Sequence, residues 1–116
     1  MPVRSLSSSV LKWPGREEVL RAAADWARRV ASEHPEVVAI GCFGSIAQGR
    51  WGIGSDLDMV MIVKDAELPF ERRSSRWDTT ELPVPVDLLV YTEGEWKELK
   101  NRLKREVMWL FQRKET

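Results

Sequence analysis

Two aspartates separated by one residue, Asp56 and Asp58, have the types and spacing that most directly suggest chemistry. They open an apolar stretch over residues 56–63 that is typical of a β-strand. Side chains two positions apart on a strand point to the same face, with Cα atoms roughly 6–7 Å apart. Two carboxylates this close oppose each other's ionisation, and a hard divalent cation such as Mg²⁺ relieves the conflict. The pair therefore predicts a metal site.

A third acid, Asp87, interrupts a later apolar stretch at residues 84–91. A carboxylate in the middle of a strand is seldom tolerated without a partner. If this strand lies beside the strand at 56–63, Asp87 joins Asp56 and Asp58. Three acids can hold two metal ions about 3.5–4 Å apart, one for a triphosphate and one for an attacking hydroxyl, whose proton Asp87 would accept. Solvated strand ends are the alternative interpretation of these acids.

A glycine-rich segment precedes the acids, with four of the seven glycines close together at Gly44, Gly49, Gly52 and Gly54. Gly44 permits a close approach of backbone to a ligand. Ser45 offers an amide donor and a hydroxyl to a phosphate in this glycine turn, where a helix could begin. Arg50 is the nearest cation in the sequence. A P-loop is excluded, because Arg50 and Trp51 follow Gly49 where that motif requires Lys and then Ser or Thr.

The hydrophobic pattern predicts the elements that position these residues. Apolar residues at three- and four-residue steps predict a helix over 16–33, and the apolar run 37–43 predicts a strand in the centre of a sheet. The polar segment 64–82 is assigned only a loop or a short helix or strand. Thr92 and Glu95 fit a capping box that opens a final helix. Its apolar stripe is Trp96, Leu99, Leu103, Val107, Leu110 and Phe111. This order predicts an α/β (α+β) fold, a mixed sheet flanked by helices.

Length and composition limit the remaining classes of protein. The 116 residues, 43% hydrophobic and 31% charged, suit one domain, assigned to 15–116 after a flexible or edge segment at 1–14. Basic and acidic residues cancel at 18 each, so direct binding to nucleic acid or a membrane is not expected. The sequence lacks a membrane span and a secretion signal, which predicts a cytoplasmic protein. The single cysteine, Cys42, excludes a disulfide framework within the chain and is expected to be buried.

Gly44-Ser45, ten intervening positions and Asp56-Leu57-Asp58 reproduce the pattern G-S-x10-D-x-D. Over about residues 37–91 the chain therefore resembles the minimal nucleotidyltransferases of the polymerase-beta-like superfamily. The resemblance implies a nucleotidyltransferase-like sheet and transfer of AMP from ATP to a hydroxyl group, with pyrophosphate leaving. It implies that Gly44 and Ser45 hold phosphates and that the three aspartates bind Mg²⁺. Asp87 matches the third, catalytic carboxylate of the family.

The same resemblance implies a partner. Family members of this size are commonly encoded with a small helical HEPN-domain protein, as antitoxin and toxin, and some adenylylate a tyrosine of that protein to silence it. A tyrosine hydroxyl of a HEPN partner is therefore the expected acceptor. A homo-oligomer is compatible with the sequence.

The sequence departs from the commonest family form, Gly-Ser-Arg-Ala-Arg-Gly, by carrying Ile46 and Gln48 in place of the two arginines. Arginine gives charge-assisted hydrogen bonds to phosphate where glutamine gives neutral ones, so slower catalysis or weaker ATP binding is expected unless Arg50 substitutes. Two other functions stay open. In the first, the chain neutralises a HEPN partner by contact alone. In the second, it modifies a small molecule such as an aminoglycoside, and the lack of room for a second, substrate-binding domain argues against this function.

Overall fold

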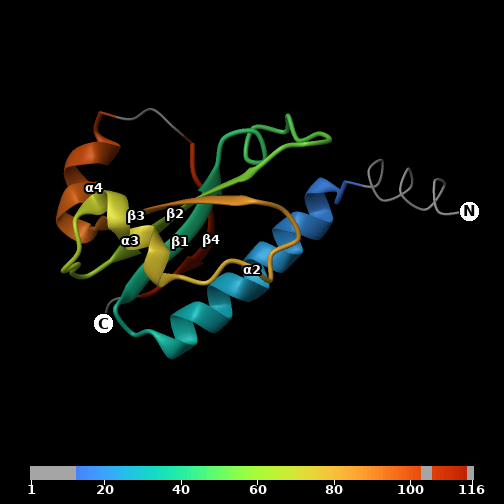
Figure 1. The fold of residues 1–116 in the computed structure, drawn as a ribbon. Helices are drawn as coiled ribbons and strands as arrows, with labels where there is room; N and C mark the ends of the chain where they lie inside the picture. The colour runs from blue at the N-terminus through green and yellow to red at the C-terminus, as the bar shows by residue number, and fades with distance from the viewer. Residues whose placement is uncertain (1–12, 103–105, 115–116) are drawn as a thin grey trace, which may run out of the picture.

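The computed structural model describes residues 13–102 and 106–114. The elements, in chain order, are α2 (Arg16–Glu33), β1 (Val37–Phe43), β2 (Leu57–Val63), α3 (Phe70–Arg73), the 3-10 helix η1 (Ser74–Arg76), β3 (Val86–Thr92), α4 (Glu93–Lys100) and β4 (Met108–Gln112). The strands form one sheet in the order β3-β2-β1-β4, with α2 along one face and α4 on the other (Figure 1). The predicted mixed sheet flanked by helices is confirmed.

Pairing within the sheet is both antiparallel and parallel. Strand β1 pairs antiparallel with β2 and with β4, so the prediction that residues 37–43 occupy the centre of a sheet is confirmed. Strand β3 pairs parallel with β2. A parallel neighbour requires a crossover, and the chain between β2 and β3 provides it through α3 and η1. The sequence left a loop, a short helix or a short strand open for the polar segment 64–82, and the structure has two short helices there.

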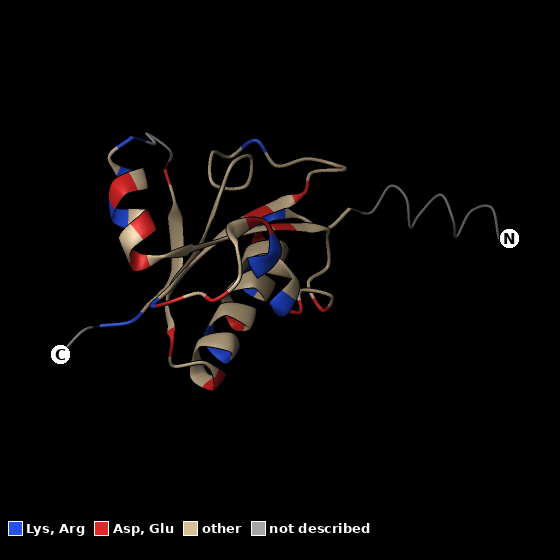
Figure 2. Ribbon diagram, turned by 60° about the vertical axis from the view of Figure 1, so that its left-hand side comes forward, with Lys and Arg blue, Asp and Glu red and all other residues tan. Residues whose placement is uncertain are grey.

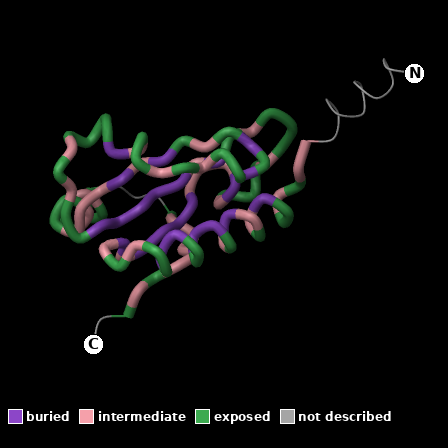
Figure 3. The backbone as a smooth tube through the Cα atoms, turned by 60° about the horizontal axis from the view of Figure 1, so that its bottom comes forward, coloured by how far each residue is buried: buried purple, intermediate pink, exposed green. Residues whose placement is uncertain are grey.

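Helix α2 has the predicted bounds and supplies most of the packing on its face of the sheet. Its buried residues repeat at helical spacing and comprise Val19, Ala23, Trp26, Ala27, Val30 and Ala31. The indole Nε1 of Trp26 donates to the carbonyl of Asp78 at 2.9 Å, which ties the segment after η1 to the helix. Figure 3 shows the result, a buried inner side of α2 against buried strands, with exposed loops around them.

The C-terminal segment differs from the prediction. Helix α4 ends at Lys100, and residues 108–112 form β4 instead of continuing the helix, so the predicted stripe through Val107, Leu110 and Phe111 was wrong; its Leu103 lies outside the described residues. The physical reason is the free edge of β1, whose backbone groups need partners. Gly41 of β1 makes the contact possible, because a Cβ there would lie 2.6 Å from Cγ1 of Val107.

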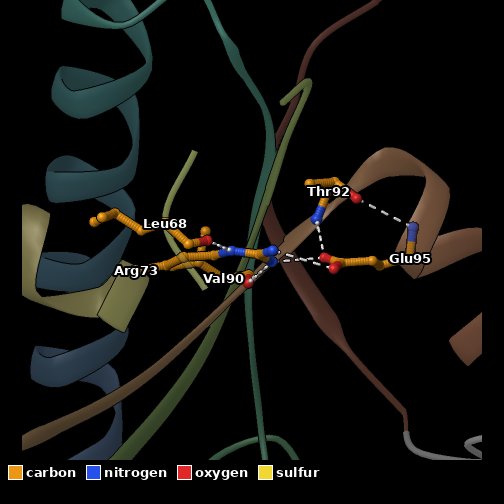
Figure 4. Close-up of polar contacts among 5 residues, drawn as sticks. All are labelled: Leu68, Arg73, Val90, Thr92 and Glu95. Carbon is orange, nitrogen blue, oxygen red and sulfur yellow. Dashed lines mark hydrogen bonds and ion pairs between the residues drawn. The ribbon is translucent and has the colours of Figure 1, made fainter. Parts of the chain in front are cut away.

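The predicted capping box at the start of α4 is confirmed and belongs to a larger polar cluster (Figure 4). Arg73 is buried and donates to both carboxylate oxygens of Glu95, at 2.6 and 3.1 Å, and to the carbonyls of Leu68 and Val90. Glu95 also accepts from the amide of Thr92. These hydrogen bonds, the one from Arg73 foremost, lower the pKa of Glu95 from 4.5 to about 2. The cluster joins α3, β3 and α4.

Charge is distributed without a single dominant patch on the helices. Acidic and basic residues both occur along α2 and along α4 (Figure 2). In the part of the chain that the structure describes, no helix combines the length and apolar character that crossing a membrane requires. Most of the segment predicted at 1–14 lies outside the described residues, although its Trp13 packs against the main core.

Candidate functional site

Asp58 and Asp87 lie side by side on neighbouring strands. They are Cα partners in the parallel register of β2 and β3, so their side chains leave the sheet on the same face. Leu57 and Met59 are fully buried on the α2 face, which leaves Asp58 on the opposite face. Asp58 is half-buried and Asp87 is exposed, so the pair is open to a ligand from solvent.

Asp56 lies immediately before β2 and is exposed. The amide of Leu57 donates to the carbonyl of Pro85 at 2.9 Å, so the strand pairing begins at this point. Strand β2 begins one residue later than predicted, so the alternation of the strand does not by itself fix the direction of the Asp56 side chain. Among residues 13–102 and 106–114, however, no three acidic, histidine or cysteine side chains gather into a metal cluster. The structure thus brings two of the three predicted aspartates together, and the metal-binding and catalytic roles of all three stay predictions.

Gly44 lies directly against the Asp58 carboxylate. Phe43, the last residue of β1, is the Cα partner of Asp58, and the chain turns at Gly44 with φ of 72°. A Cβ built on Gly44 would lie 2.3 Å from Oδ2 of Asp58, far inside van der Waals contact. Both the positive φ and the close approach therefore require glycine at this position. The bend carries Ser45, which is half-buried, to the edge of the carboxylate pair.

Residues 44–49 form a series of turns, and no helix begins at Ser45. The amides of Ala47 and Gln48 donate to the carbonyl of Gly44 at 3.1 and 3.0 Å, and the amide of Arg50 donates to that of Ser45. These hydrogen-bonded turns do not continue as a helix, because Gly49 adopts a φ of 75°, outside the helical region. Ser45 therefore lies in a compact loop and not at the N-terminus of a helix.

The two positions that depart from the family form have different environments. Ile46 is fully buried in the core, where it helps to hold the loop down. Gln48 is exposed, and its side-chain oxygen accepts a hydrogen bond from the guanidinium of Arg50. The predicted phosphate-binding residue Arg50 therefore stands next to the loop and contacts it through Gln48.

A further cation, Arg16, contacts this loop and was missed by reasoning from the sequence. Its Nε donates to the carbonyl of Ile46 at 2.7 Å, from the first turn of α2. The two residues are 30 positions apart, and no local pattern signals the contact. Arg16 braces the loop by this hydrogen bond and adds a positive charge beside it.

Two other residues considered in the sequence have structural roles. Cys42 is fully buried, as predicted, and burial raises the pKa of its thiol to about 11. A thiol in that environment is not a nucleophile near neutral pH. Trp51 packs against the core, and its Nε1 donates to the carbonyl of Pro14 at 2.9 Å. Its indole therefore ties the glycine-rich segment to the entrance of α2.

The donor set at the carboxylate pair fits Mg²⁺. This ion is commonly held by one or two carboxylates together with substrate phosphates, and it retains several waters. Asp58 and Asp87 provide the two carboxylates, and the close fit of Gly44 leaves backbone, not a side chain, facing Asp58. A cation between the two acids would therefore lie beside the backbone of the bend.

Known proteins are similar to this chain in sequence and in fold. A family model described as Nucleotidyltransferase domain matches residues 25–110, which contain every residue of the site except Arg16. The crystal structure at 1.40 Å resolution of a Sulfolobus solfataricus protein, provisionally assigned as a nucleotidyltransferase, is similar to this chain. The TM-score is 0.64, with 28% sequence identity over 84% of each chain. A search of curated proteins finds no match.

Proposed function

Because the chain belongs to the nucleotidyltransferase domain family, we propose that it transfers AMP from ATP to the hydroxyl group of a tyrosine, with Mg²⁺ as the cofactor. One observation carries the proposal: Asp58 and Asp87 are register neighbours on one face of the sheet, and the Gly44 bend lies against Asp58. Carboxylates beside a glycine bend combine the two requirements of this chemistry, a cation site and room for phosphates.

The proposed reaction assigns a task to each side chain. The acceptor oxygen attacks the α-phosphorus of ATP, the bond from that phosphorus to the bridging oxygen breaks, and pyrophosphate leaves. The hydroxyl proton passes to the carboxylate of Asp87, while Asp58 and Asp56 complete the acidic face. Gly44 and Ser45 bind the phosphates through the bend. Bound Mg²⁺ would be held by the aspartates and would neutralise charge on the phosphates.

A macromolecular acceptor is consistent with the exposure of the site. Asp87 is exposed at the start of β3, so a side chain on another protein can reach it without entering a deep cavity. Following the resemblance in the sequence, we take the acceptor to be a tyrosine of a HEPN-domain partner, which the transfer would silence. The chain would then serve as an antitoxin in the cytoplasm.

The test is transfer of label to the neighbour-encoded partner. The protein, its partner, Mg²⁺ and ATP labelled at the α-phosphate are incubated, and the partner is analysed by mass spectrometry for one added AMP. Asp58→Asn and Asp87→Asn are each expected to abolish labelling. Asp65→Asn is the matched control, because Asp65 is an exposed acid just beyond the other end of β2. Equal labelling by all variants would contradict the assigned site.

Neutralisation by contact alone is a second candidate, and the loop favours it. Ile46 is fully buried and leaves no arginine at that position to face a phosphate, and Gln48 is engaged with Arg50. If contact suffices, the Asp58→Asn and Asp87→Asn variants still inhibit the partner while no AMP is added. Loss of inhibition together with loss of labelling would reject this candidate in favour of transfer.

A further inference from the structure

An aromatic pocket continues the face of the sheet that carries the aspartates. Its volume is about 80 Å³, and its walls include Phe43, Val60, Leu89, Tyr91, Trp96 and Lys100. Strands β1, β2 and β3 supply the first four of these side chains, and α4 supplies Trp96 and Lys100. No role in the proposed reaction has yet been assigned to any of them.

The pocket begins one strand repeat from the carboxylate pair. Val60 and Leu89 are Cα partners, and each follows its aspartate by two residues on the same face, Val60 after Asp58 and Leu89 after Asp87. That spacing is about 6–7 Å along the strand. Phe43, another wall, is the Cα partner of Asp58 on β1. A group in the pocket is therefore adjacent to the carboxylate pair.

The walls suit a flat ring. The ring of Tyr91 lies 5.8 Å from that of Trp96 in a tilted contact, and Phe43 faces the same hollow from β1. Aromatic groups gain from such offset and edge contacts beyond their apolar area. The volume falls below the roughly 300–1,000 Å³ of pockets that enclose whole small molecules, so the hollow suits a single ring better than a whole nucleoside.

Lys100 adds a positive charge to the otherwise apolar and aromatic walls. It contributes the only charged side chain among the described residues that line this pocket. A nearby cation stabilises a phenolate and so lowers the pKa of a phenol, which favours loss of the hydroxyl proton. We propose that the pocket seats the phenol ring of the acceptor tyrosine, with its hydroxyl directed toward Asp87. This assignment rests on the proposed function for its reaction, but not for the binding of the ring.

The binding test uses p-cresol, the analogue of a tyrosine side chain, and the isotope-labelled full chain. Two-dimensional NMR follows the indole N–H signals of Trp96 and Trp109 during titration. The expected result is a saturable shift of the Trp96 signal. Leu89→Trp, which fills the pocket, is expected to weaken p-cresol binding at least about 10-fold, or about 1.4 kcal/mol.

The matched control is Val38→Trp. Val38 is half-buried on the same face of the sheet and lines an adjacent hollow of about 180 Å³, which shares Trp96 and Lys100 with the pocket but none of its strand residues. This variant is expected to bind p-cresol as the unaltered chain does. Thermal unfolding of both variants identifies any that fail to fold, and Leu89→Phe then replaces Leu89→Trp as the filling variant.

Binding of a non-hydrolysable ATP analogue with Mg²⁺, measured by calorimetry, shows whether the pocket belongs to the tyrosine site or to the ATP site. Unchanged analogue binding in Leu89→Trp, with p-cresol binding lost, supports the tyrosine pocket. A loss of analogue binding, or the absence of any p-cresol shift, would overturn it. If p-cresol binds but the partner is never labelled, the pocket stands and the proposed transfer fails.

Tyr91→Phe is included in labelling assays, because Tyr91 is the only tyrosine of the chain and must be excluded as the acceptor.

Discussion

The two faces of the sheet use alternate residues of the same strands for different purposes. On β2, Leu57, Met59 and Met61 are fully buried against the α2 side. Between them, Asp58 points to the other face, where it meets Asp87 and the Gly44 bend. One strand thus contributes to the core and to the candidate site at the same time, because its side chains alternate with a period of two.

The difference between the faces is one of coverage. Helix α2 spans 18 residues and covers its face, whereas α4 has 8 residues and leaves the aspartates and the aromatic pocket open. Burial of each large apolar side chain stabilises the fold by about 1.5–3 kcal/mol, so the covered face supplies most of the stability. The partly covered face retains charged groups that remain accessible to water and ligands. Four changes test this division.

The largest effect is expected from Trp26→Ala on the covered face. Trp26 is 1% exposed, so the substitution leaves a cavity and removes the hydrogen bond to Asp78, and stability falls by about 3–5 kcal/mol. The matched change on the other face is Trp96→Ala. The loss of stability is expected to be smaller there, because the indole of Trp96 is only half-buried. Urea unfolding measures both. Equal losses would show that the two faces contribute alike to stability.

Gly44→Ala is expected to reduce activity much more than it reduces the stability of the fold. The methyl group would lie 2.3 Å from Oδ2 of Asp58 and must displace that carboxylate, so activity falls by about 10²-fold or more. Gly49→Ala is the matched control, because Gly49 has a similar φ of 75° but open space around its Cβ. Each substitution introduces about 1–2 kcal/mol of backbone strain. AMP transfer and thermal unfolding are measured for both variants. An equal loss of activity in the two variants would contradict the role of Gly44 beside Asp58.

Glu95→Gln tests the polar cluster at the edge of the open face. The pKa of Glu95 is lowered from 4.5 to about 2 in the folded protein, so its carboxylate stabilises the fold above pH 4.5. That contribution disappears as the pH falls from 4.5 toward 2. Glu95→Gln is therefore less stable near neutral pH, and the difference shrinks in acid.

Thermal unfolding across this pH range checks the Glu95→Gln prediction. Glu98→Gln, an exposed change on the same helix, is the control and should show little effect at any pH in this range. A difference between Glu95→Gln and the unaltered protein that grows on acidification would contradict the role of Arg73 as the partner of the carboxylate.

The smallest effect concerns Cys42 on the covered face. Its thiol is fully buried, and its pKa is raised to about 11, so it is protonated near neutral pH. Iodoacetamide is expected to leave the native protein unmodified and active, and to modify Cys42 readily in urea. Mass spectrometry of the two reactions provides the measurement. Rapid modification of the native chain would show that the α2 face opens.

Prediction from the sequence succeeded where the signal was local. The bounds of α2 follow from its apolar period, and the capping box of α4 follows from Thr92 and Glu95. The same-face placement of Asp56 and Asp58 stays a prediction, because β2 begins at Leu57 and leaves Asp56 just outside the strand. Prediction from the sequence failed at residues 107–111, because a short apolar run fits a helix and a strand equally well. The edge of β1, more than sixty residues earlier in the chain, decided between them.

The sequence by itself thus determined which residues can form helices and strands, and which side chains can carry charge on one face. The tertiary structure decided which of them meet. Asp87 lies beside Asp58 only through the parallel register of β2 and β3, Gly44 contacts Asp58 only through the bend after β1, and Arg16 reaches the loop across 30 residues. Propensity and period act between neighbours in the chain, whereas register and close packing depend on backbone pairing between distant segments, which no local pattern encodes.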